Sequence, residues 1–354
     1  MKPAELRARR AAAQGLHPAA GGAPAAIVGR LLSVQAQDLR AAGLALRARA
    51  PGGFRADDVA AALRRDGALV VAWLMRGTLH LVRREDHAWL LALTGPTQEA
   101  GARRRLRQLG VSPGSAERAV AVVERALTAD GPLSREALAE RLAAHGIPTE
   151  GQATPHLLAL AARRGVAVIG AADDGRPAFV LARDWLGGAP PEVDRDEALA
   201  ELARRWLAAH GPATEADLAA WAGLPLRDVR AGLAAIAGEL DDPGDGLVDL
   251  AGREPPGGRP PPRLLPAFDP YLLGWRDRGF AVPAEHARDV HPGGGILRAV
   301  ATDGGRVVGT WSARRRGERL AVTVSPFARL PVRTARALDA DASDVARFEA
   351  PEPG

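Results

Sequence analysis

Two glutamines spaced two residues apart, Gln35 and Gln37, have the type and spacing most suggestive of chemistry in this chain. Counting at helical spacing from Val28 places Gln35 on an apolar face, where an amide without partners costs on the order of 1–3 kcal/mol. Amides at positions i and i+2 point apart on a helix but share a side of an extended segment. If both serve one site, the helix must end near Ala36. A core glutamine satisfied by backbone groups, beside a solvent-facing one, is the alternative.

Three polar residues are spaced two apart: Arg76, Thr78 and His80. They supply a cation, a hydroxyl and an imidazole. In a strand this spacing puts the three on one face, opposite a core face. The ordinary polar side of a half-buried strand is the alternative. His80 and His87 lack a third ligand at a recognisable spacing and the chain has no cysteine, so we expect neither a metal nor a cofactor.

Arginines gather in two dense runs and in the segment LLPAFDPYLLGWRDR, residues 264–278. The runs suit phosphate contact, or they are solvated surface. Aromatic residues interleaved with arginine can stack or clamp nucleotides, or they can anchor the part of the chain that follows. The candidate DNA-binding arginines are Arg103, Arg104, Arg105, Arg276, Arg278, Arg314, Arg315 and Arg316.

The 354 residues are 47% hydrophobic and 25% charged, which is typical of a soluble globular protein with roughly two to three domains. No apolar run is long enough to span a bilayer and no signal sequence follows the basic N-terminus. We therefore expect a cytoplasmic protein with no membrane partner.

Charge is sorted along the chain. Residues 1–110 hold 18 basic and 8 acidic residues, a net charge of +10; residues 111–261 hold 15 and 23, a net of −8; residues 262–336 hold 13 and 6, a net of +7. The scarcity of lysine reflects a mutational bias toward arginine, but such a bias would not sort signs by region. Two basic flanks predict an anionic polymer as partner, with solvated helix faces as the alternative.

The elements that position these residues follow from periodicity. Residues 115–129, 135–145 and 149–164 are predicted helices, and two short strands at 166–169 and 178–181 follow them, the order of a winged helix-turn-helix. The same order returns from residue 194, with Ser134 and Thr214 as matching N-caps. After a Pro/Gly/Arg linker at 254–262 the period becomes two, which predicts an antiparallel β domain.

The predicted class is therefore mainly α with β (α+β): tandem winged helix-turn-helix units followed by a C-terminal antiparallel β domain. In the first part of the chain, helices at 25–34, 57–65 and 86–93 and a long β-rich run at 69–82 fit a third winged-helix-like unit. The predicted divisions are residues 1–110 with the glutamine site, 111–190, 191–253, 263–330, and a helix and tail at 331–354.

Four motifs together resemble the winged-helix DNA glycosylases of the AlkZ and YcaQ type: VQAQ, WLMRGTLHLV, LLPAFDPYLLGWRDR and DGGRVVGTW. The resemblance runs over roughly residues 5–330 and implies tandem winged helices with a C-terminal β domain on a DNA-binding surface. The family's catalytic signature is Gln, a hydrophobic residue, then Gln or Asp. Gln35, Ala36 and Gln37 match the first, AlkZ-type form, and Asp38 lies one place out of register for the second.

The resemblance implies a monofunctional DNA glycosylase, a hydrolase that excises N7-alkylated purines and unhooks purine crosslinks. Gln35 and Gln37 would position the attacking water, and Arg76, Thr78 and His80 would line the site or contact the backbone. The expected partner is double-stranded DNA with alkylated purines, bound by a monomer without metal or cofactor. A catalytically silent winged-helix regulator and a structural protein of DNA ends or chromatin are the competing hypotheses.

Overall fold

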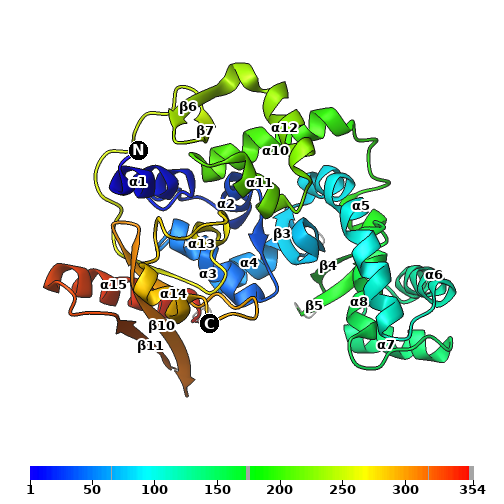
Figure 1. The fold of residues 1–354 in the computed structure, drawn as a ribbon. Coiled ribbons are helices and arrows are strands. Elements are labelled where there is room, and N and C mark those ends of the chain that lie inside the picture. The colour runs from blue at the N-terminus through cyan, green and yellow to red at the C-terminus, as the bar shows by residue number, and fades with distance from the viewer. Residues whose placement is uncertain (65, 173–175, 318, 351–354) are drawn as a thin grey trace. The chain divides into compact units, whose positions relative to one another are not determined.

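The fold is that of a computed structural model, which describes residues 1–64, 66–172, 176–317 and 319–350 (Figure 1). Contacts divide the chain into two compact units: unit 1, made of Met1–Val59, Leu199–Trp221 and Pro225–Gly354, and unit 2, made of Ala60–Ala198 and Ala222–Leu224. Helices and antiparallel strands build both, which confirms the α+β class. No helix of the described residues is long and apolar enough to cross a membrane.

The first winged helix lies in unit 2 and has the predicted order of three helices and two strands. The Ser134 hydroxyl accepts a hydrogen bond from the Ala137 amide, as expected of an N-cap. The turn predicted at residues 173–175 lies outside the described residues. The elements are α6 (Pro113–Asp130), α7 (Arg135–Ala144), α8 (Ala153–Arg163), β4 (Ala167–Ala171) and β5 (Pro177–Leu181), followed by α9 (Ala182–Leu186).

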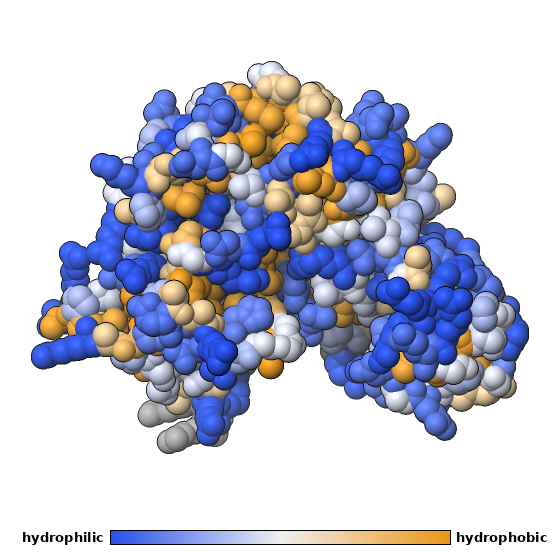
Figure 2. Space-filling view, viewed as in Figure 1, coloured by the Kyte–Doolittle hydropathy of each residue, from blue (hydrophilic) through white to orange (hydrophobic). Residues whose placement is uncertain are grey.

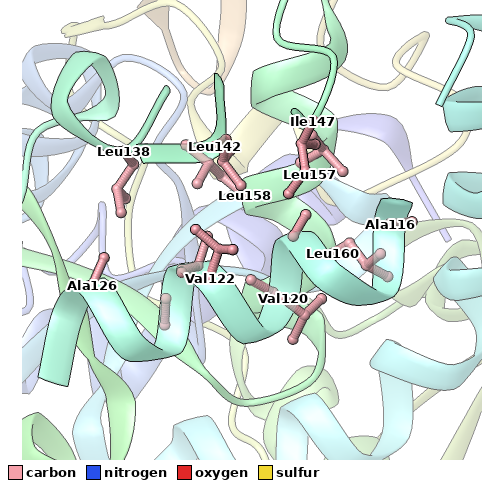
Figure 3. Close-up of a cluster of buried hydrophobic side chains, with 14 of the residues drawn as sticks. Ala116, Val120, Val122, Ala126, Leu138, Leu142, Ile147, Leu157, Leu158 and Leu160 are labelled. Atoms are coloured by element: carbon pink, nitrogen blue, oxygen red, sulfur yellow. The ribbon is translucent and has the colours of Figure 1, made fainter. Parts of the chain in front are cut away.

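Apolar side chains from α6, α7 and α8 meet in one core (Figure 3). Leu138 and Leu142 of α7 and Leu157 of α8 are 0% exposed. Burying each such leucine stabilises the fold by roughly 1.5–3 kcal/mol relative to leaving it in water. Hydrophilic residues cover most of the outer surface of this helical lobe, at the lower right of Figure 2. The apolar residues of these helices are therefore buried in the core, and the hydrophilic residues cover the surface.

The wing is not an isolated hairpin, because a second hairpin of unit 2 extends it. β2 (Leu69–Trp73) pairs antiparallel with β3 (Leu79–Arg83) and, through Val71 opposite Ile169, with β4. The predicted continuous β run at 69–82 was therefore wrong at its centre, where a 3-10 turn, η1 (Met75–Gly77), reverses the chain.

Two helices of this region differ from the prediction. α5 (Arg84–Gln108) is 25 residues long and continues through Pro96, whereas the sequence predicted an end near Leu93. A proline can bend a helix without ending it when packing holds both sides, and α5 packs against α6 and α8. α4 (Ala56–Ala62) ends before Arg65, the predicted end, which lies outside the described residues.

The second winged helix contains the predicted helices and a better-formed wing than the sequence indicated. The Thr214 hydroxyl accepts a hydrogen bond from the Asp217 amide, which confirms the predicted N-cap. Leu240 and Leu250 are opposite each other in a two-stranded sheet. The elements are α10 (Arg195–His210), α11 (Glu215–Ala222), α12 (Leu226–Ala235), η2 (Ala237–Glu239), β6 (Leu240–Gly244) and β7 (Leu247–Leu250).

The C-terminal part of unit 1 is a four-stranded antiparallel sheet in the order β11-β10-β9-β8. The strand predicted from Ile296 begins only at Val300. Three glycines with positive φ, Gly293 to Gly295, make a turn, after which Ile296 bridges back to Gly293. The elements are β8 (Arg263–Leu265), α13 (Pro270–Leu273), η3 (Ala284–His286), α14 (Ala287–Val290), β9 (Val300–Asp303), β10 (Arg306–Arg316), β11 (Arg319–Pro326) and α15 (Val332–Phe348).

The N-terminal part of unit 1 carries the predicted glutamine site. Its elements are α1 (Pro3–Ala13), α2 (Pro24–Leu31), β1 (Val34–Gln35) and α3 (Leu39–Arg49). Contact clustering divides residues 1–110 between the two units at Val59. The finer division into five segments stays a prediction.

Candidate active site

The segment that carries the two glutamines begins with a strained turn. α2 ends at Leu31, so the helix predicted at residues 25–34 was about three residues too long. Leu32 adopts φ 67° and ψ −44°, a left-handed conformation that costs a non-glycine residue on the order of 1–3 kcal/mol. Its side chain is 0% exposed, so burial of the leucine offsets that cost. This turn ends the helix and directs the chain into extended backbone.

Extended backbone then places both amides on the same side. Val34 and Ala36 are buried, while Gln35 between them is half-buried and Gln37 is exposed. The Gln35 Nε2 group donates a hydrogen bond to Gln37 Oε1 at 2.8 Å. The expectation that Gln35 occupies a helix face was wrong, because the helix has ended before it. The two amides lie together, the geometry that an i, i+2 spacing allows only outside a helix.

The next residue, Asp38, has a structural task. It is the N-cap of α3, and its Oδ1 accepts a hydrogen bond from the Ala41 amide at 3.1 Å. Such a cap stabilises the start of a helix by typically about 1 kcal/mol. The carboxylate therefore points along the helix start and is engaged by its backbone.

Sequence patterns gave no sign of a further polar group in this segment. The Ser33 side chain is buried, and its Oγ has no hydrogen-bond partner among the described residues. A buried hydroxyl without a partner costs roughly 1–3 kcal/mol. Leu32 and Ser33 thus put two unfavourable features directly before the glutamines, and strain of this kind clusters at functional sites. A serine between apolar residues carries no signal that sequence reasoning could have used.

The residues Arg76, Thr78 and His80 belong to unit 2 and do not share one strand face. Arg76 lies in the η1 turn with φ 55°, and Thr78 directly precedes β3. Only His80 lies within the strand. The predicted period-two face was wrong because Arg76 and Gly77, both with positive φ, close a hairpin between β2 and β3.

His80 is an internal group of that hairpin. Its side chain is 2% exposed, and its Nδ1 lies 3.0 Å from the Thr78 carbonyl oxygen. Burial lowers its pKa to about 3, and the neighbouring Arg76 charge acts in the same direction. The imidazole is therefore neutral at physiological pH and helps to hold the backbone at Thr78.

The predicted basic runs differ in how far their arginines are engaged. Arg103 of α5 bridges Glu99 and Glu117 at 2.7 and 2.9 Å, in a network with Arg164. The Arg164 hydrogen bond holds the pKa of Glu117 at about 2. Arg104 is exposed and has no partner among the described residues, while Arg105 donates to the side chains of Gln108 and Gln152.

In unit 1, Arg314 and Arg315 are exposed on β10 near the end of the long β10–β11 hairpin. The side chain of Arg316 lies outside the described residues. Arg276 is exposed, and Arg278 is half-buried with its Nε donating to the Leu272 carbonyl at 2.8 Å. The structure thus brings Gln35 and Gln37 together and distributes the arginines over both units.

The segment 264–278 is mainly an anchor, the second of its two possible roles. Asp269 is 0% exposed and forms a bidentate ion pair with the equally buried Arg49, at 2.9 and 3.0 Å. Tyr271 is also buried, and its hydroxyl donates to the Gly305 carbonyl. Trp275 is 3% exposed, which leaves it no face for stacking on a nucleotide.

Among the described residues, no group of three or more His, Asp or Glu side chains could hold a metal ion. The groups that Gln35 and Gln37 present are amides. An amide oxygen accepts hydrogen bonds from water and can face a developing positive charge, but it is far too weak a base to take up a proton fully.

Comparisons with known proteins identify the family of this chain. The family described as "DNA glycosylase AlkZ-like" matches residues 28–348, which include the glutamine segment and the C-terminal sheet. The chain is 32% identical over 347 residues, 91% of its length and 89% of the relative, to an "Interstrand DNA cross-link repair glycosylase" of Streptomyces sahachiroi.

A solved structure gives the same relationship. The DNA glycosylase AlkZ of Streptomyces sahachiroi superposes with a TM-score of 0.79 at 29% sequence identity, over 98% of each chain. A family match over nine-tenths of the chain and this identity are sufficient to assign membership. The chain therefore belongs to the AlkZ-like DNA glycosylase family, and it is a DNA glycosylase, a hydrolase of the N-glycosidic bond.

Proposed function

We propose that this glycosylase excises N7-alkylated purines from double-stranded DNA and that Gln35 and Gln37 together position the attacking water. The observation that carries the proposal is the 2.8 Å hydrogen bond between the two amides, on an extended segment that follows a strained turn. The family signature of Gln, a hydrophobic residue and Gln falls on the same residues. The relative's name mentions interstrand cross-links, and we extend the proposal to the unhooking of such links.

The chemistry requires little from the protein. Alkylation at N7 makes the purine cationic, so the base leaves with the bonding electron pair as a neutral molecule and needs no acid. Water adds to C1′ and releases its proton to solvent, which leaves an abasic site. The barrier then depends on holding the water beneath C1′ and on stabilising an oxocarbenium-like sugar.

The amide pair is suited to that limited task. Gln37 Oε1 uses one lone pair for the Gln35 amide and has a second that can accept from a water. Because Gln35 orients the Gln37 side chain, the second acceptor direction is fixed before the substrate arrives. Amides are too weak as bases for a normal purine, which limits damage to intact DNA.

DNA contacts follow from the arginines, and we propose that the protein binds its substrate as a monomer. Arg76, Thr78, Arg104 and Arg105 of unit 2 and Arg276, Arg278, Arg314, Arg315 and Arg316 of unit 1 remain the candidate contacts. His80 and Arg103 act on their own neighbours, the Thr78 backbone and the Glu99–Glu117 network. Such contacts are sequence-independent and weaken steeply with salt.

Base release from a duplex with one N7-methylguanine tests the proposal. Replacing Gln35 or Gln37 by Ala should lower the single-turnover excision rate by about 10²-fold, the scale of one positioned catalytic group, with duplex affinity retained. The double variant should lose much less than the product of the single effects, because the two amides share one task.

Asp38→Asn is the matched control, since asparagine keeps the α3 cap and removes the carboxylate. It should retain nearly the full rate. Loss of excision in Asp38→Asn together with full rates in both glutamine variants would show that the base is a carboxylate. A native chain that binds the duplex and releases no base would replace catalysis with a binding role.

A further inference from the structure

Unit 1 contains a cavity of about 750 Å³ that the glutamine site does not use. α1, the segment from Arg276 to His291 and the start of β10 form its walls. Its lining includes the apolar residues Phe280, Val282 and Pro283. It also includes arginine side chains, which come from parts of the chain separated by almost 300 residues. The cavity thus combines apolar and cationic lining residues.

Five arginines line this cavity: Arg7, Arg276, Arg278, Arg288 and Arg306. Among the described residues none of the five forms an ion pair, although Arg164, Arg204 and many other arginines of this chain are paired with carboxylates. Only two carboxylates line the cavity, Asp277 and Glu285, so the lining carries an excess of three positive charges. Asp277 is partly engaged, since its Oδ1 accepts from the Gly279 amide.

Two of the guanidinium groups are held in place before any ligand binds. Arg7 donates from Nη1 to the Phe280 carbonyl at 3.2 Å and from Nε to the Gly304 carbonyl at 3.3 Å. Arg278 donates from Nε to the Leu272 carbonyl at 2.8 Å. Each keeps further N–H groups for an acceptor. Burial lowers the pKa of Arg278, so a bound anion would stabilise its charge.

We propose that this cavity binds a phosphodiester group of the DNA strand and anchors unit 1 on the substrate. The proposal deepens the proposed function and rests on it for the identity of the polymer. Several guanidinium groups in one cavity suit the oxygens of a phosphate, with which arginine forms bidentate hydrogen bonds. The apolar residues of the lining can pack against a deoxyribose.

Two of the three exposed arginines of the cavity, Arg288 and Arg306, provide the variant, and the third, Arg276, is left unchanged. Neither guanidinium group of the replaced pair donates a hydrogen bond to a described residue, so Arg288→Gln/Arg306→Gln should fold normally. Arg333→Gln/Arg336→Gln is the matched control, because both residues are exposed on α15, outside the cavity, and removing them changes the net charge equally. Fluorescence anisotropy of a labelled duplex, over a series of KCl concentrations, measures the affinity.

The cavity variant should bind the duplex about 10-fold more weakly, and the slope of log K against log salt should fall by about 1 unit, since the one phosphate contact that is lost contributes about 0.9. Its excision rate at saturating protein should stay within about 2-fold of the native rate. Equal losses in the cavity and control variants would overturn the proposal, because general charge would explain both.

Inorganic phosphate distinguishes the two sources of the ligand. Calorimetric titration of the native chain with phosphate should give no binding below about 1 mM if the site needs the DNA strand around its phosphate. Tight binding of free phosphate that the cavity variant loses, with unchanged duplex affinity, would assign the cavity to a small phosphorylated ligand and overturn the proposal. Fluorescence anisotropy measures duplex binding and requires no base release. The test of the cavity is therefore independent of whether the chain excises N7-methylguanine.

Discussion

At the scale of single residues, the glutamine pair illustrates how a local conformation makes a site. Gln35 and Gln37 are ordinary polar residues whose amides would point apart on a helix. The left-handed turn at Leu32 ends α2 and lets them share a hydrogen bond. The neighbouring carboxylate of Asp38 is used by the backbone of α3. Adjacent polar residues therefore have different roles, which their order along the chain does not reveal.

The role of Asp38 leads to a stability prediction. Asp38→Ala removes the acceptor of the Ala41 amide at the start of α3, so the free energy of unfolding should fall by about 1 kcal/mol. Asp38→Asn keeps an acceptor and should change it by less than about 0.5 kcal/mol. Urea denaturation of the full chain measures both variants. Equal losses in the two would mean that the carboxylate charge, and not the cap, matters for stability.

At the scale of elements, a buried ion pair connects α3 to the beginning of the C-terminal domain. Arg49 at the end of α3 and Asp269 before α13 are both 0% exposed. The same aspartate accepts a hydrogen bond from the Tyr271 amide, and Arg49 also donates to Gln14 Oε1 of the α1 region. The Arg49–Asp269 ion pair thus connects three segments of unit 1 that are distant in the sequence. This role as an anchor accounts for the polar and aromatic residues of the segment 264–278.

Breaking that pair should be costly. Asp269→Asn leaves the Arg49 charge buried without a counter-charge, so the free energy of unfolding should fall by roughly 3–5 kcal/mol. Glu215→Gln, which breaks the exposed pair with Arg230, is the matched control and should cost less than about 1 kcal/mol. Chemical denaturation of both variants makes the comparison. A loss below about 1 kcal/mol for Asp269→Asn would show that the pair contributes little to the anchor.

At the scale of the whole molecule, three buried histidines couple the fold to pH. Burial lowers the pKa of His80 and His210 to about 3 and that of His87 to about 4. His210 lies in unit 1, stacked on Trp206, and the other two lie in unit 2. Both units therefore contain imidazoles that are neutral when folded and take up a proton when the chain unfolds.

The sign of the effect follows from linkage. In the unfolded chain these histidines titrate near 6.5, above their folded pKa values, so unfolding takes up protons below that pH. The contribution of these histidines to the free energy of unfolding should be complete above about pH 6.5. It should fall as pH decreases toward 4, by on the order of 1 kcal/mol per pH unit for each histidine. Urea unfolding between pH 7.5 and 5 measures this.

A variant isolates the cause. His87→Gln removes one titrating group whose Nε2 has no hydrogen-bond partner among the described residues, so the dependence on pH should become shallower. Stability that is equal at pH 5 and pH 7.5 in the native chain would contradict the prediction. So would an unchanged slope in the variant.

The sequence by itself determined what depends on neighbours along the chain. The apolar period of 3.6 residues predicted α6, and the capping side chains of Ser134 and Thr214, with the glycines that follow the two helices, predicted α7 and α11. A period of two fixed β10 and β11. Charge sorting between regions and the register of Gln35 and Gln37 were also present in the residues. The helices, strands and caps depend on contacts within a few residues, where pattern and structure correspond directly, and the charge of a region follows from its composition alone.

Only the tertiary structure decided the features that depend on distant contacts. Burial of Leu32 ended α2 early, packing carried α5 past Pro96, and hairpin closure at Arg76 divided a run that looked continuous. The arginines around the cavity of unit 1 come from both ends of the chain, so no local pattern relates Arg7 to Arg306. The physical reason is that burial and charge pairing depend on which segments meet in space, and local propensity is too weak to oppose them.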